Sequence, residues 1–313
     1  WHANAVSTIR RIAPQLPILM DIPGKKIRTI ALAHEPSFDV NDKIILTTDT
    51  SHDGSRKVPV SWPHLNKKLK AGDIILADDG TLRFTVEQVD GLDIVCIAEV
   101  AGTLKSRKGI NVPMVPLDME LMTDRDRFMI AFAVEQGVDF VGISFVESAA
   151  HVDLVRDACG PSGPAIVAKI ENAAGLSNMV EVIEAADAIM IDRGDLSVET
   201  RLETVAIEQK RILAQAIDQG KPVIVATEML HSMIDNPSPT KAEIADITNA
   251  VLDGASATML SGETAAGSFP LKAVKMMRAI TNAAENYLWD SGYITPKTSL
   301  MASEHSIPSA MRH

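Results

Sequence analysis

The sequence predicts an α/β protein with a parallel barrel of the (β/α)8 type and a small all-β domain inserted into it. From about residue 117, short β-branched runs alternate with amphipathic stretches, which is typical of repeated βα units and a parallel sheet. Between residues 25 and 112 the apolar runs are shorter, and Asp-Gly turns separate them as in antiparallel hairpins. Charged residues directly follow several of the later runs, and the carboxyl ends of barrel strands are where this fold places its chemistry.

Six barrel strands are expected, one before the inserted segment and five after it. The starts of the last five are 27, 23, 34 and 35 residues apart, which is enough for one helix and two short loops each. The expected strands are 16–21, 138–145, 165–170, 188–191, 222–227 and 257–260. A closed barrel needs eight strands, so we expect an additional amino-terminal βα region in the intact protein.

Helix signals occur between the expected strands. Residues 203–219 carry an apolar face and end before Gly220, and Thr240 with Glu243 forms a capping-box pattern at the start of another helix. The expected domains are a discontinuous barrel (1–24 and 113–290), a β-barrel-like inserted domain (25–112), and a tail (291–313) that leads toward a further carboxyl-terminal domain.

Composition narrows the class of function. The net charge of −11 and the pI near 5.2 argue against nucleic-acid and anionic-membrane partners, which require basic surfaces. Cys96 and Cys159 lie in separate apolar runs, as expected for reduced core thiols rather than a disulfide. There is no signal-peptide pattern and no apolar run of membrane-spanning length, so we expect a soluble, cytoplasmic protein.

The strongest chemical signal is a lysine and an acid at the end of one strand. Lys169 and Glu171 are two residues apart, so in a strand their side chains point the same way. Asp195 follows the next strand and adds a second carboxylate. Two carboxylates can hold Mg²⁺ while the ammonium neutralises an anionic group. A purely structural ion pair at a strand end is the alternative reading.

Four segments together resemble the pyruvate kinase family in order and spacing. They are 165–171, 189–196, 221–234 and 249–265, and the likeness covers nearly the whole chain, with a further match at 106–113. The resemblance implies Mg²⁺- or Mn²⁺-dependent phosphoryl transfer from phosphoenolpyruvate to ADP, giving pyruvate and ATP. It also implies a homo-oligomer, tetrameric or dimeric, and an inserted domain that acts as a mobile lid.

The resemblance also implies roles for single residues at the barrel strand ends. Glu171 and Asp195 would be the metal ligands, and Lys169 would stabilise the migrating phosphoryl group and the enolate oxygen. Gly194 and Asp195, through their amides, and Thr227 would bind the substrate carboxylate. Thr227 also lies near the point where the family protonates the enolate, although a hydroxyl bonding a nearby carbonyl is an ordinary alternative for threonine.

The resemblance also assigns roles to charged residues near the start and end of the inserted domain. Arg28 would contact phosphate, and Lys108 would reach the nucleotide. Asp21 would serve a monovalent cation. Family members that need K⁺ tend to have glutamate at the position of Lys26, so the ammonium of Lys26 is expected to replace K⁺ here.

The chain also departs from the family pattern beside the site. Asp192 stands where the family usually has alanine, Glu228 where it has glutamine, and Ile22-Pro23 where it has threonine and lysine. These changes leave two alternatives open. One is a metal-dependent lyase or aldolase that acts on a pyruvate enolate, and the other is a catalytically impaired regulatory relative.

Overall fold

The computed structural model describes residues 1–113, 115, 117 and 119–291. The chain forms two compact units. Of the described residues, the first contains Trp1–Gly24, Met122–Leu196 and Glu203–Ser291, and the second contains those of Lys25–Leu121 and Ser197–Leu202. The expected tail at 291–313 lies outside the described residues except for Ser291.

The first unit is built on one sheet of six parallel strands, as the sequence predicted. Neighbouring strands follow chain order, which is the arrangement that successive βα units produce. Among the described residues the sheet is a half-barrel, because its first and last strands each pair with one neighbour. In order across the sheet, the strands are β1 (Leu19–Ile22), β11 (Phe140–Ile143), β12 (Ala165–Ile170), β13 (Ala188–Asp192), β14 (Val223–Ala226) and β15 (Ala257–Met259).

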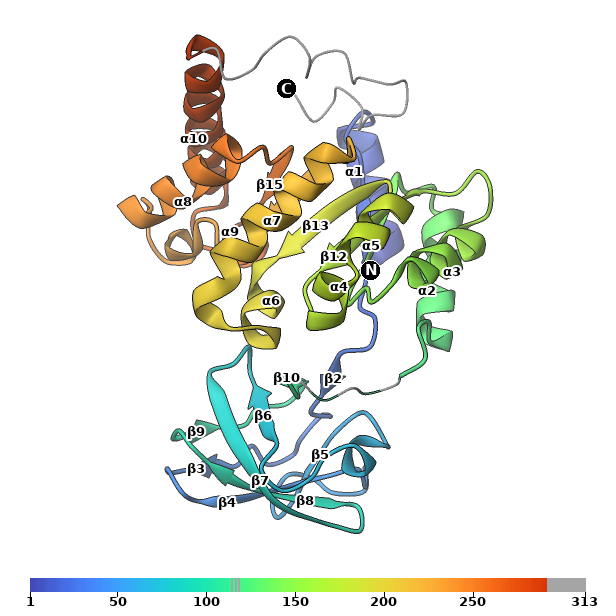
Figure 1. The fold of residues 1–313 in the computed structure, drawn as a ribbon, viewed down its shortest axis with the longest axis vertical. Helices are drawn as coiled ribbons and strands as arrows, with labels where there is room; N and C mark the ends of the chain where they lie inside the picture. Colours follow the sequence, from blue (N-terminus) through green and yellow to red (C-terminus); the bar gives the residue numbers. More distant parts are fainter. Residues whose placement is uncertain (114, 116, 118, 292–313) are drawn as a thin grey trace. The chain divides into compact units, whose positions relative to one another are not determined.

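Helices cover one face of this sheet (Figure 1). Strand residues such as Ile166 and Ile189 belong to one buried cluster with helix residues such as Val155 and Leu213. The helices of the unit are α1 (His2–Ile12), α2 (Asp124–Glu135), α3 (Ala149–Cys159), α4 (Ala173–Ser177), α5 (Met179–Ala185), α6 (Arg193–Glu199), α7 (Val205–Asp218), α8 (Lys241–Leu252), α9 (Gly262–Ala265) and α10 (Pro270–Asp290), of which α6 continues into the second unit.

The opposite face, which we call the inner face, has its own apolar cluster made only of strand residues. Its buried members are Phe140, Val167, Ala188, Met190, Ile224 and Ala226. Because side chains alternate along a strand, the polar positions that follow these residues by two also belong to the inner face. Both faces of the strands are buried, which explains their nearly continuous apolar sequences.

Strand ends differ from the expected ones for local reasons. Strand β14 starts at Val223 because Pro222 has no N–H to donate, and it ends before Thr227, whose φ of 68° is left-handed. Strand β11 ends at Ile143, two residues before Phe145, which is also left-handed with φ 54°. Strand β13 runs one residue further than expected and includes Asp192.

The second unit is all-β, as predicted. A seven-stranded mixed sheet and a two-stranded sheet surround an apolar core that includes Phe84, Ile75 and Leu104. Its strands are β2 (Ile27–Arg28), β3 (Ser37–Phe38), β4 (Lys43–Thr47), β5 (Val58–Pro59), β6 (Ile74–Ala77), β7 (Leu82–Asp90), β8 (Asp93–Ala98), β9 (Gly102–Thr103) and β10 (Gly109–Asn111). This unit extends nine residues beyond the expected boundary at 112 and also takes in Ser197–Leu202.

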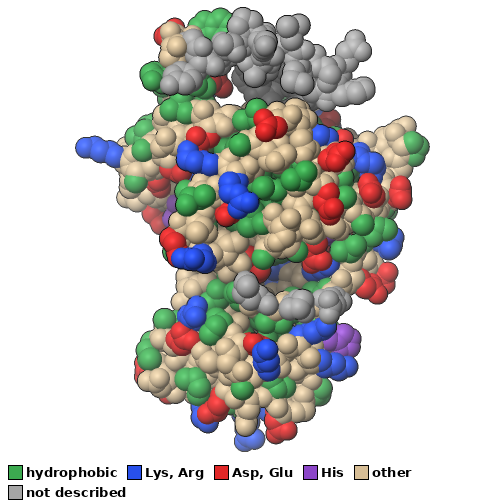
Figure 2. Space-filling model, in the orientation of Figure 1, with side chains coloured by type: hydrophobic (Ala, Val, Ile, Leu, Met, Phe, Trp, Pro, Cys, Tyr) green, Lys and Arg blue, Asp and Glu red, His purple; other side chains and the backbone are tan. Residues whose placement is uncertain are grey.

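The surface charges, the cysteines and the helices can be compared with the expectations from composition. On the face shown in Figure 2, acidic and basic side chains are interspersed rather than gathered by sign. Cys96 and Cys159 are both buried free thiols, as expected. Among the described residues no helix is both long and apolar enough to cross a lipid bilayer.

The capping box predicted at the start of α8 is present and also ties down the preceding loop. Thr240 Oγ1 accepts a hydrogen bond from the Glu243 amide at 3.2 Å, and Glu243 Oε2 accepts from the Thr240 amide at 2.7 Å. The same carboxylate accepts from the amide and the hydroxyl of Ser232, at 2.7 and 2.6 Å. Glu243 therefore fixes the loop that follows β14 against the start of α8.

We expect Glu243→Gln to lower the free energy of unfolding by about 1–2 kcal/mol at neutral pH, because these bonds are made to a charged group. Burial raises the pKa of Glu243, but the bonds from Ser232 and Thr240 outweigh it, so the pKa lies below its ordinary value of 4.5. A lowered pKa stabilises the native state above pH 4.5 and loses this effect as the pH falls through the native-state value.

Urea denaturation from pH 7 down to about pH 3 measures the difference between the two forms. The difference should shrink on acidification, and Glu285→Gln, an exposed change on α10, should show little effect throughout. A difference that stays constant or grows in acid would contradict this role of Glu243.

Candidate active site

Polar side chains gather where the strands of the barrel unit end. Asp21 of β1, Lys169 of β12 and Asp192 of β13 each follow an inner-face apolar residue by two positions, and Ser144 follows Gly142 of β11 in the same way. Because the strands are parallel and paired in register, these four positions meet at one edge of the sheet.

The ammonium of Lys169 is the centre of this group. Its Nζ lies 3.2 Å from Glu171 Oε2, 3.2 Å from Asp192 Oδ2 and 3.4 Å from Asp21 Oδ2, and it donates to Ser144 Oγ at 3.1 Å. Only 7% of the Lys169 side chain is exposed. Burial alone would lower the pKa of Lys169, but the surrounding carboxylates outweigh it and raise the pKa. The side chain is therefore a fixed positive charge.

Glu171 is the most buried acid of the group. It follows β12 directly, its side chain is inaccessible to solvent, and its Oε1 accepts a hydrogen bond from the Phe145 amide at 2.8 Å. Within the part of the chain that is described, Oε2 has no hydrogen-bond donor and makes only the ion pair with Lys169. Burial raises the pKa of Glu171 to about 8, and repulsion from Asp192 and Asp195 adds to the rise, while Lys169 opposes it.

Three carboxylates converge beside Lys169. One oxygen from each of Glu171, Asp192 and Asp195 lies within 4.8 Å of the other two. Oxygen ligands of this kind suit Mg²⁺ and Mn²⁺, and the buried Glu171 oxygen without a donor fits a group that a cation would satisfy. The sequence pointed to Glu171 and Asp195 as a pair but did not include Asp192 among the ligands.

Thr227 lies beside Gly194, close to this cluster, in a strained turn. Thr227 and Glu228 are left-handed, with φ values of 68° and 53°, which is costly for residues other than glycine. The guanidinium of Arg193 donates to the carbonyl of Thr227 at 2.8 and 3.2 Å and to that of Glu228 at 3.2 Å, and it pairs with Asp246 at 2.6 Å. Sequence reasoning missed this clamp, which holds the turn in place.

The turn brings the Thr227 hydroxyl to Gly194. The Gly194 amide donates to Thr227 Oγ1 at 2.8 Å, and the hydroxyl donates to the Ala226 carbonyl at 2.6 Å. Both readings of Thr227 from sequence are therefore relevant here, because the hydroxyl bonds a nearby carbonyl and also meets the amide expected to bind a carboxylate.

The predicted phosphate and nucleotide contacts belong to the second unit. Arg28 and Lys108 lie near each other there, because Arg28 pairs with Gly109 across strands β2 and β10. Arg28 donates to the carbonyl of Arg107 at 3.1 Å, and Lys108 pairs with Asp78 at 2.6 Å. Lys26, the expected substitute for K⁺, lies 3.9 Å from Asp79 in the same unit.

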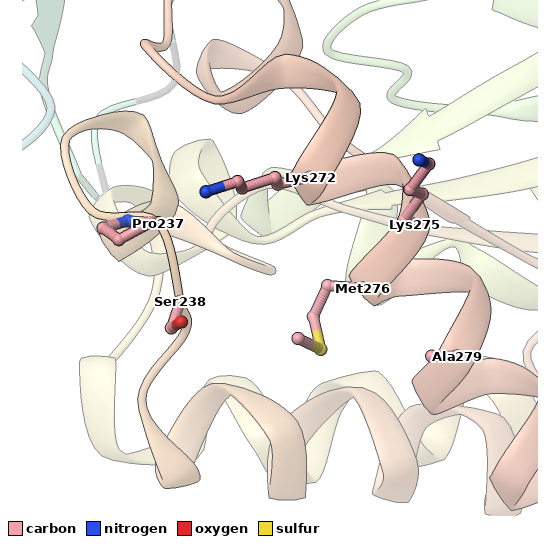
Figure 3. Close-up of a pocket in the computed structure, with 6 residues that line it drawn as sticks. All are labelled: Pro237, Ser238, Lys272, Lys275, Met276 and Ala279. Atoms are coloured by element: carbon pink, nitrogen blue, oxygen red, sulfur yellow. The ribbon is translucent and has the colours of Figure 1, made fainter.

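A surface groove on the barrel unit is separate from these residues. It measures about 330 Å³ and lies between α10 and the loop before α8. In Figure 3, Lys272 of α10 points toward Pro237, and Met276 of α10 points into the space between α10 and Ser238. None of the residues predicted from sequence lines this groove, so we place the chemistry at the strand ends.

We expect Lys169→Met to lower the free energy of unfolding of the metal-free chain by about 3–5 kcal/mol, because it leaves buried carboxylates without their cation. Lys210→Met is the matched control. Lys210 pairs with Asp253 at 2.5 Å, but 57% of its side chain is exposed, so its loss should cost less than about 1 kcal/mol. Urea denaturation in a chelating buffer compares the two. Equally small losses of unfolding free energy in the two variants would contradict this expectation and show that the carboxylates around Lys169 are solvated.

Comparison with known proteins gives one consistent result. The family model described as pyruvate kinase, barrel domain, matches residues 2–274. Pyruvate kinase from Clostridium perfringens is 39% identical over 309 residues, which is 94% of this chain and 64% of that protein. The enzyme from Thermococcus litoralis is 39% identical over 93% of this chain and 63% of its own length. Human pyruvate kinase PKLR is 38% identical over 91% and 53%.

The chain thus spans roughly half to two thirds of the length of these curated relatives. The matches extend over both compact units, and the family model includes Lys169, Glu171 and Asp195 within its range. The resemblance found in the sequence motifs is confirmed, and the chain belongs to the pyruvate kinase family.

Proposed function

We propose that this protein transfers the phosphoryl group of phosphoenolpyruvate to ADP, forming pyruvate and ATP. The observation that supports this most is the buried ammonium of Lys169, which carboxylates from neighbouring strands surround at the carboxyl edge of a pyruvate kinase family barrel. Phosphoryl transfer depends mainly on positioning and charge neutralisation. A fixed cation beside a set of metal-binding acids provides both.

Glu171 and Asp195 would hold a divalent cation, Mg²⁺ or Mn²⁺, at this edge. When bound, the cation would neutralise charge on the phosphoryl and enolate oxygens. In the reaction an ADP oxygen forms a bond to phosphorus, the bond from phosphorus to the enol oxygen breaks, and the enolate carbon gains a proton. The raised pKa of Lys169 keeps it protonated, so its role would be electrostatic stabilisation of the leaving oxygen rather than proton donation.

Thr227 would act beside the substrate carboxylate. A carboxylate that accepts from the Gly194 amide would replace the present bond from that amide to Thr227 Oγ1. The hydroxyl would then be able to hold a water molecule from which the enolate carbon takes its proton. The Arg193 clamp would keep the hydroxyl at this position, because it bonds the carbonyls of both turn residues, Thr227 and Glu228.

Arg28 and Lys108 would bind phosphate groups of the substrate and nucleotide. Both are cations of the second unit, and the bond to Asp78 is the main cause of the raised pKa of Lys108, which remains charged. Asp21, half of whose side chain is exposed, would serve a monovalent cation.

A coupled assay of ATP formation from phosphoenolpyruvate and ADP with Mg²⁺ tests the proposal. Lys169→Met should lower kcat by at least about 10³-fold, because a preorganised charge is lost. Lys210→Met, remote from the strand ends, should keep normal activity. No ATP from the folded wild-type chain would contradict the proposal. In that case, exchange of pyruvate protons with solvent in the absence of nucleotide would favour a lyase or aldolase. Binding of phosphoenolpyruvate without any turnover would favour a catalytically impaired relative.

The monovalent cation gives a separate prediction. If the ammonium of Lys26 replaces K⁺, the wild-type rate should be the same in K⁺ as in a bulky inert cation, and Lys26→Glu should make the rate depend on K⁺. The same coupled assay in the two salts at equal ionic strength measures this. A wild-type rate that already requires K⁺ would exclude the replacement.

A further inference from the structure

Asp192 is a third acid of the cluster, and its backbone is held by the sheet. It is the last residue of β13, paired in register with Ala226 of β14, and 8% of it is exposed. Its Oδ2 lies 3.2 Å from Lys169 Nζ, and one of its oxygens is within 4.8 Å of ligand atoms of both Glu171 and Asp195. The carboxylate therefore faces both the ammonium of Lys169 and the expected metal ligands.

The charges around Lys169 do not balance. Among the described residues, three acids, Asp21, Glu171 and Asp192, contact its single ammonium, so with all three ionised two negative charges exceed the one positive charge. The neighbouring guanidinium of Arg193 bonds instead to the turn at Thr227 and to Asp246. An anion that approaches Lys169 therefore also meets the acids that contact its ammonium, so excess negative charge would oppose its binding.

A second observation points to a cation in this cluster. Glu171 Oε2 is fully buried and has no hydrogen-bond donor within the described part of the chain; its partner is the Lys169 ammonium at 3.2 Å, which it shares with two other acids, and it also lies near oxygens of Asp192 and Asp195. Buried oxygens without a donor are costly unless another group satisfies them. A divalent cation among the three acids would satisfy this oxygen and remove the charge excess.

We propose that Asp192 is a third carboxylate ligand for the divalent cation and makes that cation a prerequisite for binding an anion beside Lys169. The proposal rests on the proposed function and adds to it the order of binding, first the cation and then phosphoenolpyruvate. Each added carboxylate raises the affinity of an oxygen site for a divalent cation. The same charge penalises an anion that arrives before the cation.

Titration calorimetry with Mn²⁺ alone tests the first part. Asp192→Ala should weaken Mn²⁺ binding by at least about 10- to 100-fold, because loss of a mere hydrogen-bonding partner of a metal ligand already has that effect and a direct ligand should matter no less. Asp218→Ala removes the same charge at the exposed end of α7, which leads into the start of β14 and so lies away from the carboxyl edge. It should bind Mn²⁺ as the wild type does. Equal Mn²⁺ affinity of Asp192→Ala and the wild type would overturn the proposal.

Two further variants distinguish failure of the proposed role of Asp192 from failure of the metal site itself. Glu171→Gln should abolish Mn²⁺ binding whether or not Asp192 takes part. Loss in Glu171→Gln with no change in Asp192→Ala would reject only the role of Asp192, whereas no Mn²⁺ binding by the wild type would reject the metal site of the proposed function. Asp192→Asn keeps the shape of the side chain, and a thermal melt of each variant verifies folding, so this variant carries the test if Asp192→Ala does not fold.

Phosphoenolpyruvate binding in a chelating buffer tests the second part. The wild type should bind at least about tenfold more tightly when Mn²⁺ is added, since the cation cancels the excess charge. Asp192→Ala should bind more tightly than the wild type in the chelator and should gain less from Mn²⁺. Equal affinities of the two forms without metal would contradict the proposed charge penalty.

Discussion

The burial of the Lys169 ammonium among carboxylates is the constraint on which the rest of the site depends. A charge removed from water costs several kcal/mol unless partners compensate it. Here the partners come from β1, β13 and the residue after β12, and the inner-face alternation of parallel strands aligns all of them. A shift of one residue in the register of any of these strands would turn its polar residue away and leave the ammonium uncompensated.

A second constraint lies at the end of β14. Thr227 and Glu228 occupy left-handed backbone conformations that neither residue favours, and the Arg193 guanidinium bonds to both carbonyls. Arg193 is itself held by Asp246 of α8. The position of one hydroxyl therefore depends on three separate elements, so the site is built from contacts between elements distant in sequence rather than from one loop.

The sequence allowed the six barrel strands and the inserted β-domain to be predicted because each strand is a short apolar run with clear limits. The first strand starts later than expected, at Leu19; Pro17 has no N–H to donate to a sheet, and the Leu16 carbonyl accepts a hydrogen bond from Arg10 instead. The pairing of Lys169 with Glu171 followed from their spacing. The same argument applies to Asp192, which follows Met190 by two, because β13 runs one residue beyond the apolar run that ends at Ile191.

The clamp by Arg193 could not be predicted in this way. Its partners are 34, 35 and 53 residues away in sequence, and nothing in the local pattern joins them. The limits of the two units could not be predicted from local sequence patterns either. The short segment Ser197–Leu202 belongs to the second unit because of its contacts in the folded chain.

The most direct measurement is a crystal structure of the chain soaked in Mn²⁺, with anomalous diffraction recorded at the manganese edge. The account predicts one strong peak at the carboxyl edge of the barrel, about 2.1 Å from oxygens of Glu171, Asp192 and Asp195, which is the distance typical of such small divalent cations. A peak located elsewhere, with Lys169 still enclosed by the same carboxylates, would contradict it.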